Sequence, residues 1–118
     1  IGREAIARLK KGALVINTSR GGIIDEEALA EALNSGHLGG AGIDVFSKEP
    51  PPAANPLLKA ASAVLSPHAA ALTRECVVRM AVLAAQRVLD LFDGFIPENV
   101  ANPQVLAQER WRQLKPRQ

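Results

Sequence analysis

The 118-residue chain has one cysteine, Cys76, no tyrosine and few other aromatic residues. A single cysteine excludes an internal disulfide framework and a metal site built from several thiolates. With few aromatics and a net charge of only +2, the chain lacks the basic, aromatic-rich surface typical of nucleic-acid binding. No apolar run reaches the length of a membrane span, and no signal peptide is recognisable. We therefore expect a cytoplasmic protein with neither nucleic-acid nor membrane partners.

Three further features are missing. The sequence begins at Ile1 rather than methionine and enters a helical pattern within a few residues, which favours a chain whose beginning is absent. The glycines at 39, 40 and 42 precede a strand pattern rather than a helix, so they do not form a Gly-x-Gly-x-x-Gly turn. We interpret them as allowing close strand packing or a tight turn. His37 and His68 have no metal-ligand spacing, so no metal site is expected.

One stretch near the start combines a strand, a polar loop and a helix. Residues 14–16 form a short apolar run typical of a buried strand, residues 17–20 are polar, and Asp25 occupies the N-cap position of a helix predicted at 26–35. Ligands of open α/β sheets bind beyond the carboxyl ends of the strands, where Arg20 lies. Its guanidinium suits a carboxylate or phosphate. The alternative is a surface arginine that caps the loop.

The rest of the pattern predicts an α/β fold. We expect a helix at 3–11 ended by Gly12, strands at 43–46 and 63–65, a stiff proline-rich loop at 47–55 and a helical turn at 56–59. The alternation of strands and helices indicates parallel strands with a right-handed crossover. Thr73 suits the N-cap of a long helix at 74–93, whose wide apolar surface predicts burial on two sides. The tail at 110–118 is expected to be disordered.

The predicted strands are followed by Arg20, Glu49 and His68, and Asp44 lies at the end of the second strand. A histidine with a carboxylate partner has a favoured tautomer and exchanges a proton near neutral pH. A nearby arginine would hold an anionic substrate and polarise its carbonyl. These groups suit reduction of a 2-keto acid with hydride from a nicotinamide cofactor. Asp44 could accept from an amide such as that of nicotinamide. Otherwise Asp44 caps the two residues after it, and Glu49 is a solvated loop residue.

Three blocks of sequence resemble the D-isomer-specific 2-hydroxyacid dehydrogenases. They are Asn-Thr-Ser-Arg-Gly-Gly at 17–22 with Asp25, Gly-Ile-Asp-Val-Phe at 42–46 with Glu49-Pro50, and Ser-Pro-His at 66–68. Their order and spacing agree with the family over residues 1–103. The resemblance implies the C-terminal half of a Rossmann-like NAD-binding domain at 1–71, with parallel strands and flanking helices. It implies a long interdomain helix and tail at 72–118, which return to a substrate domain upstream of Ile1.

The resemblance also implies roles for individual residues. Arg20 corresponds to the arginine that binds the substrate, Glu49 to the glutamate paired with the catalytic histidine, and His68 to the proton donor and acceptor. Arg20 and His68 would also contact the cofactor, NAD or NADP, together with Thr18, Ser19, Asp44, Ala69, Ala70 and Ala71. The family often has glycine directly after the histidine, where this chain has three alanines. The implied substrate is a small 2-keto or 2-hydroxy acid, and we expect a homodimer.

Two other hypotheses stay open at this level. Transcriptional corepressors that resemble the family keep similar residues, so a nucleotide-sensing scaffold without turnover is the alternative to an enzyme. The chain by itself lacks the phosphate-binding turn and most of the substrate site. We therefore expect the isolated chain to be inactive, and to self-associate through its strand edges and its long apolar helix.

Overall fold

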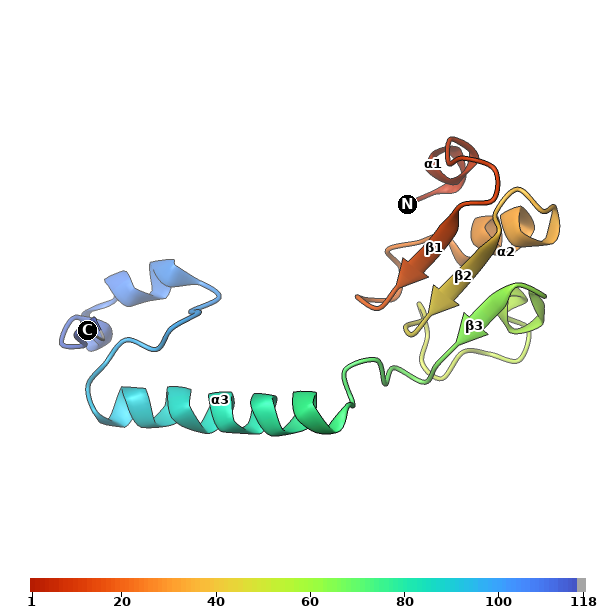
Figure 1. Cartoon of the computed structure of the whole chain (residues 1–118). Coiled ribbons are helices and arrows are strands. Elements are labelled where there is room, and N and C mark those ends of the chain that lie inside the picture. Colours follow the sequence, from red (N-terminus) through yellow and green to blue (C-terminus); the bar gives the residue numbers. More distant parts are fainter. Residues whose placement is uncertain (117–118) are drawn as a thin grey trace. The chain divides into compact units, whose positions relative to one another are not determined.

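The computed structural model of the chain describes residues 1–116. It contains two compact units, Ile1–Ala71 and Leu72–Gln118 (Figure 1). The described strands all belong to the first unit, and the long helix belongs to the second. Within residues 1–116, no helix combines the length and the apolar character needed to cross a membrane.

A three-stranded parallel sheet forms the centre of the first unit (Figure 1). Strand β1 (Leu14–Asn17) pairs with β2 (Gly40–Ile43), and β2 pairs with β3 (Ala63–Leu65). Helix α2 (Glu26–Asn34) connects β1 to β2, and the 3-10 helix η1 (Pro56–Lys59) precedes β3. The predicted α/β class with parallel strands is confirmed.

One face of this sheet is covered and the other is open. Helix α1 (Arg3–Ala7) and α2 share a hydrophobic core with the inward-facing strand residues, which includes Ile6, Leu29, Leu33, Ile43 and Leu57. Alternate strand residues point to the opposite face. There Leu14 and Ile16 are each 72 % exposed and Val64 is 75 % exposed. The sheet therefore presents an uncovered apolar surface within its own unit.

The second strand lies three residues earlier than predicted, at Gly40–Ile43 rather than 43–46. Gly40 and Gly42 pair with Leu14 and Ile16 of β1. A Cβ on Gly40 would lie 3.3 Å from Cδ2 of Leu14, so the glycines do permit close strand packing. The prediction placed the start of the strand too late because glycine has a low intrinsic preference for strands.

The first helix is also shorter than predicted, because it ends at Ala7 rather than near residue 11. Ile6 is buried against the core, but Leu9 is exposed. The amide of Leu9 donates to the carbonyl of Ile6 in a tight turn. A further helical turn would therefore bury no apolar side chain. Gly12 has the left-handed φ of +81° expected of it, but several residues beyond the helix.

The predicted caps of the two longer helices are confirmed. Oδ1 of Asp25 accepts from the amide of Ala28 at 3.0 Å at the start of α2. Oγ1 of Thr73 accepts from the amide of Cys76 at 3.1 Å at the start of α3 (Arg74–Phe92). Gly36 and Gly94 follow these helices with φ of +70° and +80°.

Within its own unit, α3 buries only one side chain, Asp90. Its carboxylate accepts from Nη1 of Arg87 at 2.9 Å and from Nε2 of Gln86 at 3.1 Å. Val82 and Phe92 are exposed. The contacts within this unit leave the apolar side chains of α3 exposed, and the expected burial on two sides stays a prediction.

The described part of the tail is folded, contrary to the prediction of disorder at 110–118. Two 3-10 helices, η2 (Pro103–Ala107) and η3 (Glu109–Trp111), lead into an isolated parallel bridge between Phe95 and Lys115. The amide of Lys115 donates to the carbonyl of Gly94 at 2.9 Å. Apolar packing supports the tail around a cavity of about 220 Å³ lined by Leu91, Pro97, Val100, Val105, Leu106, Trp111 and Leu114. Residues 117 and 118 of that prediction lie outside the described residues.

Candidate active site

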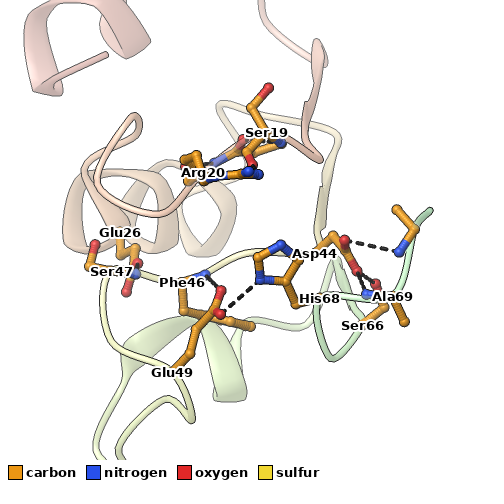
Figure 2. Close-up of polar contacts among 12 residues, drawn as sticks. Ser19, Arg20, Glu26, Asp44, Phe46, Ser47, Glu49, Ser66, His68 and Ala69 are labelled. Carbon is orange, nitrogen blue, oxygen red and sulfur yellow. Dashed lines mark hydrogen bonds and ion pairs between the residues drawn. The ribbon is translucent and has the colours of Figure 1, made fainter. Parts of the chain in front are cut away.

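The candidate residues follow the carboxyl ends of the three parallel strands. Arg20 comes shortly after β1, Asp44 directly after β2 and His68 shortly after β3. Glu49 lies in the loop between β2 and η1. Parallel strands end at a common edge of their sheet, which is the edge where open α/β sheets bind ligands. The topology therefore gathers residues from distant parts of the sequence at one end of the first unit (Figure 2).

Glu49 and His68 form a hydrogen-bonded pair at this edge. Oε2 of Glu49 lies 2.8 Å from Nδ1 of His68, and Oε1 accepts from the amide of Phe46 at 3.0 Å (Figure 2). These two hydrogen bonds, that from His68 above all, hold the pKa of the Glu49 carboxyl below its ordinary value. An ionised carboxylate requires a proton on Nδ1, which leaves Nε2 of His68 for exchange with a ligand.

Asp44 holds the loop that carries His68. Its carbonyl oxygen accepts from the amide of His68 at 2.8 Å, and its carboxylate accepts from the amides of Ala69 at 2.8 Å and Ala70 at 3.0 Å. The hydroxyl of Ser66 donates to the same carboxylate (Figure 2). The hydrogen bond from Ser66, followed by those from the two amides, lowers the pKa of Asp44, although its burial acts in the opposite direction. Asp44 is 4 % exposed.

The arrangement corrects one interpretation of Asp44. A cap on the next two residues, Val45 and Phe46, is not formed, because the amide of Phe46 donates to Glu49 instead. The carboxylate caps the loop after β3. A carboxylate offers roughly four acceptor positions, of which the three donors from Ser66, Ala69 and Ala70 fill three. Oδ2 accepts one of these three hydrogen bonds, from the amide of Ala70, and Oδ1 accepts the other two.

The loop that carries Arg20 is shaped by Asn17, which is buried at the end of β1. Nδ2 of Asn17 donates to the carbonyl of Arg20 at 3.0 Å, and Oδ1 accepts from the amide of Ser19 at 3.1 Å. The exposed Arg20 side chain donates through Nη1 to the carbonyl of Ser19 at 2.6 Å. Thr18 and Ser19 are exposed on the same loop. Within the part of the chain that the structure describes, no hydrogen bond or ion pair joins Arg20 to Glu49 or His68.

Gly21 brings the Arg20 loop into direct contact with the backbone beside Glu49. A Cβ at this position would lie 1.9 Å from the carbonyl oxygen of Phe46 and 2.6 Å from the amide nitrogen of Ser47. Only glycine permits such an approach without displacement of one segment. The guanidinium and the Glu49–His68 pair are thus carried by loops that touch.

An apolar cavity of about 260 Å³ lies beside the pair. It is lined by Phe46, Glu49, Pro50, Pro51, Pro67 and His68. Three prolines give this wall little conformational freedom. Over residues 1–116, no three His, Cys, Asp or Glu side chains lie together in a way that would hold a metal ion.

Two residues that shape the site were missed by the sequence interpretation. Asn17 had a usable signal, because an asparagine two residues before Ser19 is typical of an Asx turn. Glu26 accepts from the amide of Ser47 and from the side chain of Asn55. Nothing local indicates this, because its partners lie 21 and 29 residues along the chain.

Comparison with known proteins identifies the family of the chain. Residues 1–70 match the family model described as D-isomer specific 2-hydroxyacid dehydrogenase, NAD binding domain. A glyoxylate reductase of Korarchaeum cryptofilum is 44 % identical over 106 residues, which cover 90 % of this chain and 32 % of the relative. A D-3-phosphoglycerate dehydrogenase of Methanocaldococcus jannaschii is 42 % identical over 116 residues, which cover 98 % of this chain and 22 % of the relative.

Among solved structures, the TT0316 protein of Thermus thermophilus superposes with a TM-score of 0.72 at 43 % identity. That match covers 83 % of this chain and 31 % of the other. The chain therefore spans about a third or less of the length of these proteins. The family match extends over more than half of the chain and includes all the candidate residues except Ala71. On this evidence the chain belongs to the D-isomer-specific 2-hydroxyacid dehydrogenases and contains part of their Rossmann-like NAD-binding domain.

Proposed function

We propose that the chain is the C-terminal part of an NAD(P)-dependent 2-hydroxyacid dehydrogenase, which interconverts a 2-keto acid and a 2-hydroxy acid. The observation that carries the proposal is the hydrogen bond between Glu49 and Nδ1 of His68 at the carboxyl edge of the sheet. Family membership supports the same chemistry. Glyoxylate and hydroxypyruvate are the first substrates to test, because relatives are named as reductases of these compounds.

His68 is the proposed proton donor and acceptor. The carboxylate of Glu49, whose pKa lies below its ordinary value, keeps the proton of the neutral imidazole on Nδ1. Nε2 of the imidazolium then donates a proton to the carbonyl oxygen during reduction and takes it back during oxidation. A positioned acid or base of this kind contributes roughly 10²- to 10⁴-fold to the rate.

Arg20 is the proposed substrate-binding residue. Its side chain is exposed and makes one hydrogen bond, to the carbonyl of Ser19. The remaining N–H donors of the planar guanidinium suit the carboxylate of a 2-keto acid, and a donor near its carbonyl polarises that bond.

The cofactor-binding residues fit the nicotinamide end of NAD or NADP. Thr18 and Ser19 lie beyond β1, and we assign Oδ2 of Asp44, which accepts from the amide of Ala70, to the carboxamide of the nicotinamide. Two of the amides at Ala69–Ala71 already donate to Asp44, so we assign this segment to the wall of the site. The nicotinamide supplies the hydride when it is bound.

We also propose the domain organisation that the resemblance implies. Residues 1–71 are the C-terminal half of the cofactor domain, and 72–118 belong to a helix and tail that return to the substrate domain. The division of the chain after Ala71 and the exposed apolar side chains of α3 support this proposal. A homodimer and a cytoplasmic location stay predictions.

The test is turnover by the full-length protein. NADH and NADPH consumption is followed with glyoxylate, hydroxypyruvate and pyruvate, and the chain Ile1–Gln118 is assayed in parallel. We expect reduction by the full-length protein and none by the chain alone. Cofactor binding without reduction of any 2-keto acid would instead favour the nucleotide-sensing scaffold.

A further inference from the structure

A single carboxylate holds both ends of the loop that carries Glu49. Oε1 of Glu26 accepts from the amide of Ser47 at 2.6 Å, and Oε2 accepts from Nδ2 of Asn55 at 2.6 Å. Ser47 is close to the end of β2, and Asn55 directly precedes η1. Figure 2 shows Glu26 beside Ser47, next to the turn that leads to Glu49. One side chain of α2 therefore bridges the two ends of the loop.

Asn55, the second partner of Glu26, is connected to the hydrophobic core. Asn55 is buried, and its Oδ1 accepts from the amide of Leu57, which is itself buried in η1. The amide of Asn55 donates to the carbonyl of Pro52. The Asn55 side chain is thus fixed at both its oxygen and its nitrogen. The bond to Glu26 connects this rigid point to α2.

The contact between Glu49 and His68 cannot hold the loop by itself. The two side chains are 38 % and 47 % exposed, and exposed ion pairs contribute little stabilisation. Bonds from neutral N–H groups to an ionised carboxylate are shorter and stronger than neutral ones. Glu26 makes two of them, one at each end of the loop.

The helix terminus does not explain this arrangement. Glu26 and Glu27 both lie in the first turn of α2, where a carboxylate interacts favourably with the helix dipole. Glu27 is exposed and accepts none of the hydrogen bonds that the described residues make. The chain thus supplies a matched residue that has the charge of Glu26 but not its contacts.

We infer that Glu26 is a positioning residue, which fixes the loop at 47–55 so that the carboxylate of Glu49 meets Nδ1 of His68. Its effect on turnover rests on the proposed function. Its effect on the Glu49–His68 hydrogen bond does not, because that bond can be observed without substrate or cofactor.

Three variants separate this role from a general loss of stability. In Glu26→Gln, one oxygen still accepts, but the new NH₂ group faces a second donor at either Ser47 or Asn55, so one anchor is lost. In the double variant E26Q/N55D, the carboxylate at position 55 accepts from the new NH₂ and still accepts from the amide of Leu57. This reverses the polarity of the bond and restores it. Glu27→Gln removes the same charge from the same helical turn and is the control.

The readout is the tautomer of His68, measured by ¹⁵N spectra of the chain Ile1–Gln118 with labelled histidine. The chain has only two histidines. Nε2 of His37 lies 3.2 Å from the carbonyl of Ile6, so this ring carries its proton on Nε2 and serves as an internal reference of the opposite tautomer. Unchanged His37 signals also report that the variant is folded. Amide exchange of Ser47 reports the anchor itself.

We expect Glu26→Gln to shift His68 from the Nδ1–H towards the Nε2–H tautomer. Hydrogen exchange should rise by roughly 10-fold at whichever anchor is lost, the amide of Ser47 or the side-chain amide of Asn55, as the loss of a charge-assisted bond predicts. Glu27→Gln changes neither, and E26Q/N55D restores both. In the full-length enzyme, kcat falls in Glu26→Gln while KM for the cofactor is unchanged.

A wild-type tautomer of His68 in Glu26→Gln, with or without faster Ser47 exchange, overturns the inference. Absence of turnover in the wild-type enzyme would overturn the proposed function instead, and the tautomer comparison would still decide the role of Glu26.

Discussion

The backbone amide of His68 donates to the carbonyl oxygen of Asp44 at 2.8 Å, although His68 has a left-handed φ of +55°. This backbone region is uncommon for residues other than glycine, and it persists where surrounding contacts enforce it. Asp44 supplies those contacts, because the next two amides donate to its carboxylate. The conformation of the proposed catalytic residue therefore depends on a neighbouring strand.

We expect Asp44→Asn to loosen this loop. Replacement of one carboxylate oxygen by NH₂ sets a donor against the amide of Ala69 or Ala70. Amide exchange at these two residues should rise by roughly 10- to 100-fold, in line with the loss of a hydrogen bond to a charged group. Asp93→Asn, at an exposed position after α3, is the control. Wild-type exchange rates in Asp44→Asn would contradict the role given to its carboxylate.

The same loop should respond to acid. The folded-state pKa values of Asp44 and Glu49 lie below their ordinary values, so the folded chain binds fewer protons than the unfolded chain as the pH falls. Their stabilisation is complete above the ordinary carboxyl values near pH 4 and is lost as the pH falls through the lower folded values. The ¹³C shift of the Asp44 carboxyl should therefore report a titration midpoint below its ordinary value near pH 4. A transition above pH 5 would argue against this assignment.

Removal of the proposed proton donor should abolish most turnover. In the full-length enzyme, His68→Gln is expected to lower kcat by roughly 10²- to 10⁴-fold, the usual contribution of general acid–base catalysis. Glu49→Gln should lower it less, because the imidazole remains but loses its ionised partner. His37→Gln is the control, because the described residues give the His37 ring one hydrogen-bond partner, the carbonyl of Ile6. A loss of less than tenfold in His68→Gln would rule out the proton-transfer role.

A methyl group at Gly21 should destabilise the first unit. The new Cβ would lie 1.9 Å from the carbonyl oxygen of Phe46, so one loop must move. Overpacking of this kind costs about 1–3 kcal/mol. Gly42→Ala is the matched control, because its Cβ would lie 3.6 Å from Cγ1 of Ile16, an ordinary contact. Denaturant unfolding of both variants tests the difference, and equal midpoints would contradict it.

The isolated chain should self-associate. Leu14, Ile16 and Val64 are exposed on the open face of the sheet, and contiguous exposed apolar surface favours association. Sedimentation at several concentrations should show species larger than a monomer. The double variant Ile16→Lys/Val64→Lys should reduce them if the sheet is responsible, and Val78→Lys should do so if α3 is. A monomer with a cooperative thermal transition would contradict the prediction.

Local signals predicted much of the fold. Asp25 and Thr73 were identified as helix caps because capping depends on residues three positions apart. The order of strand ends predicted which residues would share the carboxyl edge. The start of β2 was missed, because its glycines obtain their strand geometry from Leu14 and Ile16 of the neighbouring strand.

The sequence indicated the proposed catalytic residues more clearly than the residues that hold them in place. The resemblance indicated Arg20, Glu49 and His68, and their catalytic roles stay predictions. The anchors beneath them were less visible. Glu26 binds partners that are remote in sequence. The carboxylate of Asp44 accepts from amides of the loop after β3, and the pairing of β2 with β3 is what brings that loop close to it.

Gly21 and Glu26 both contact the turn formed by Phe46 and Ser47. The backbone of Gly21 lies against this turn, and Glu26 accepts a hydrogen bond from the amide of Ser47. This has a practical consequence for gene shuffling within the family. A crossover placed between 26 and 46 would take the two sides of these contacts from different parents, whereas crossovers outside 20–47 inherit them together. Recombinant libraries that keep this segment intact should therefore yield a larger fraction of active chimeras.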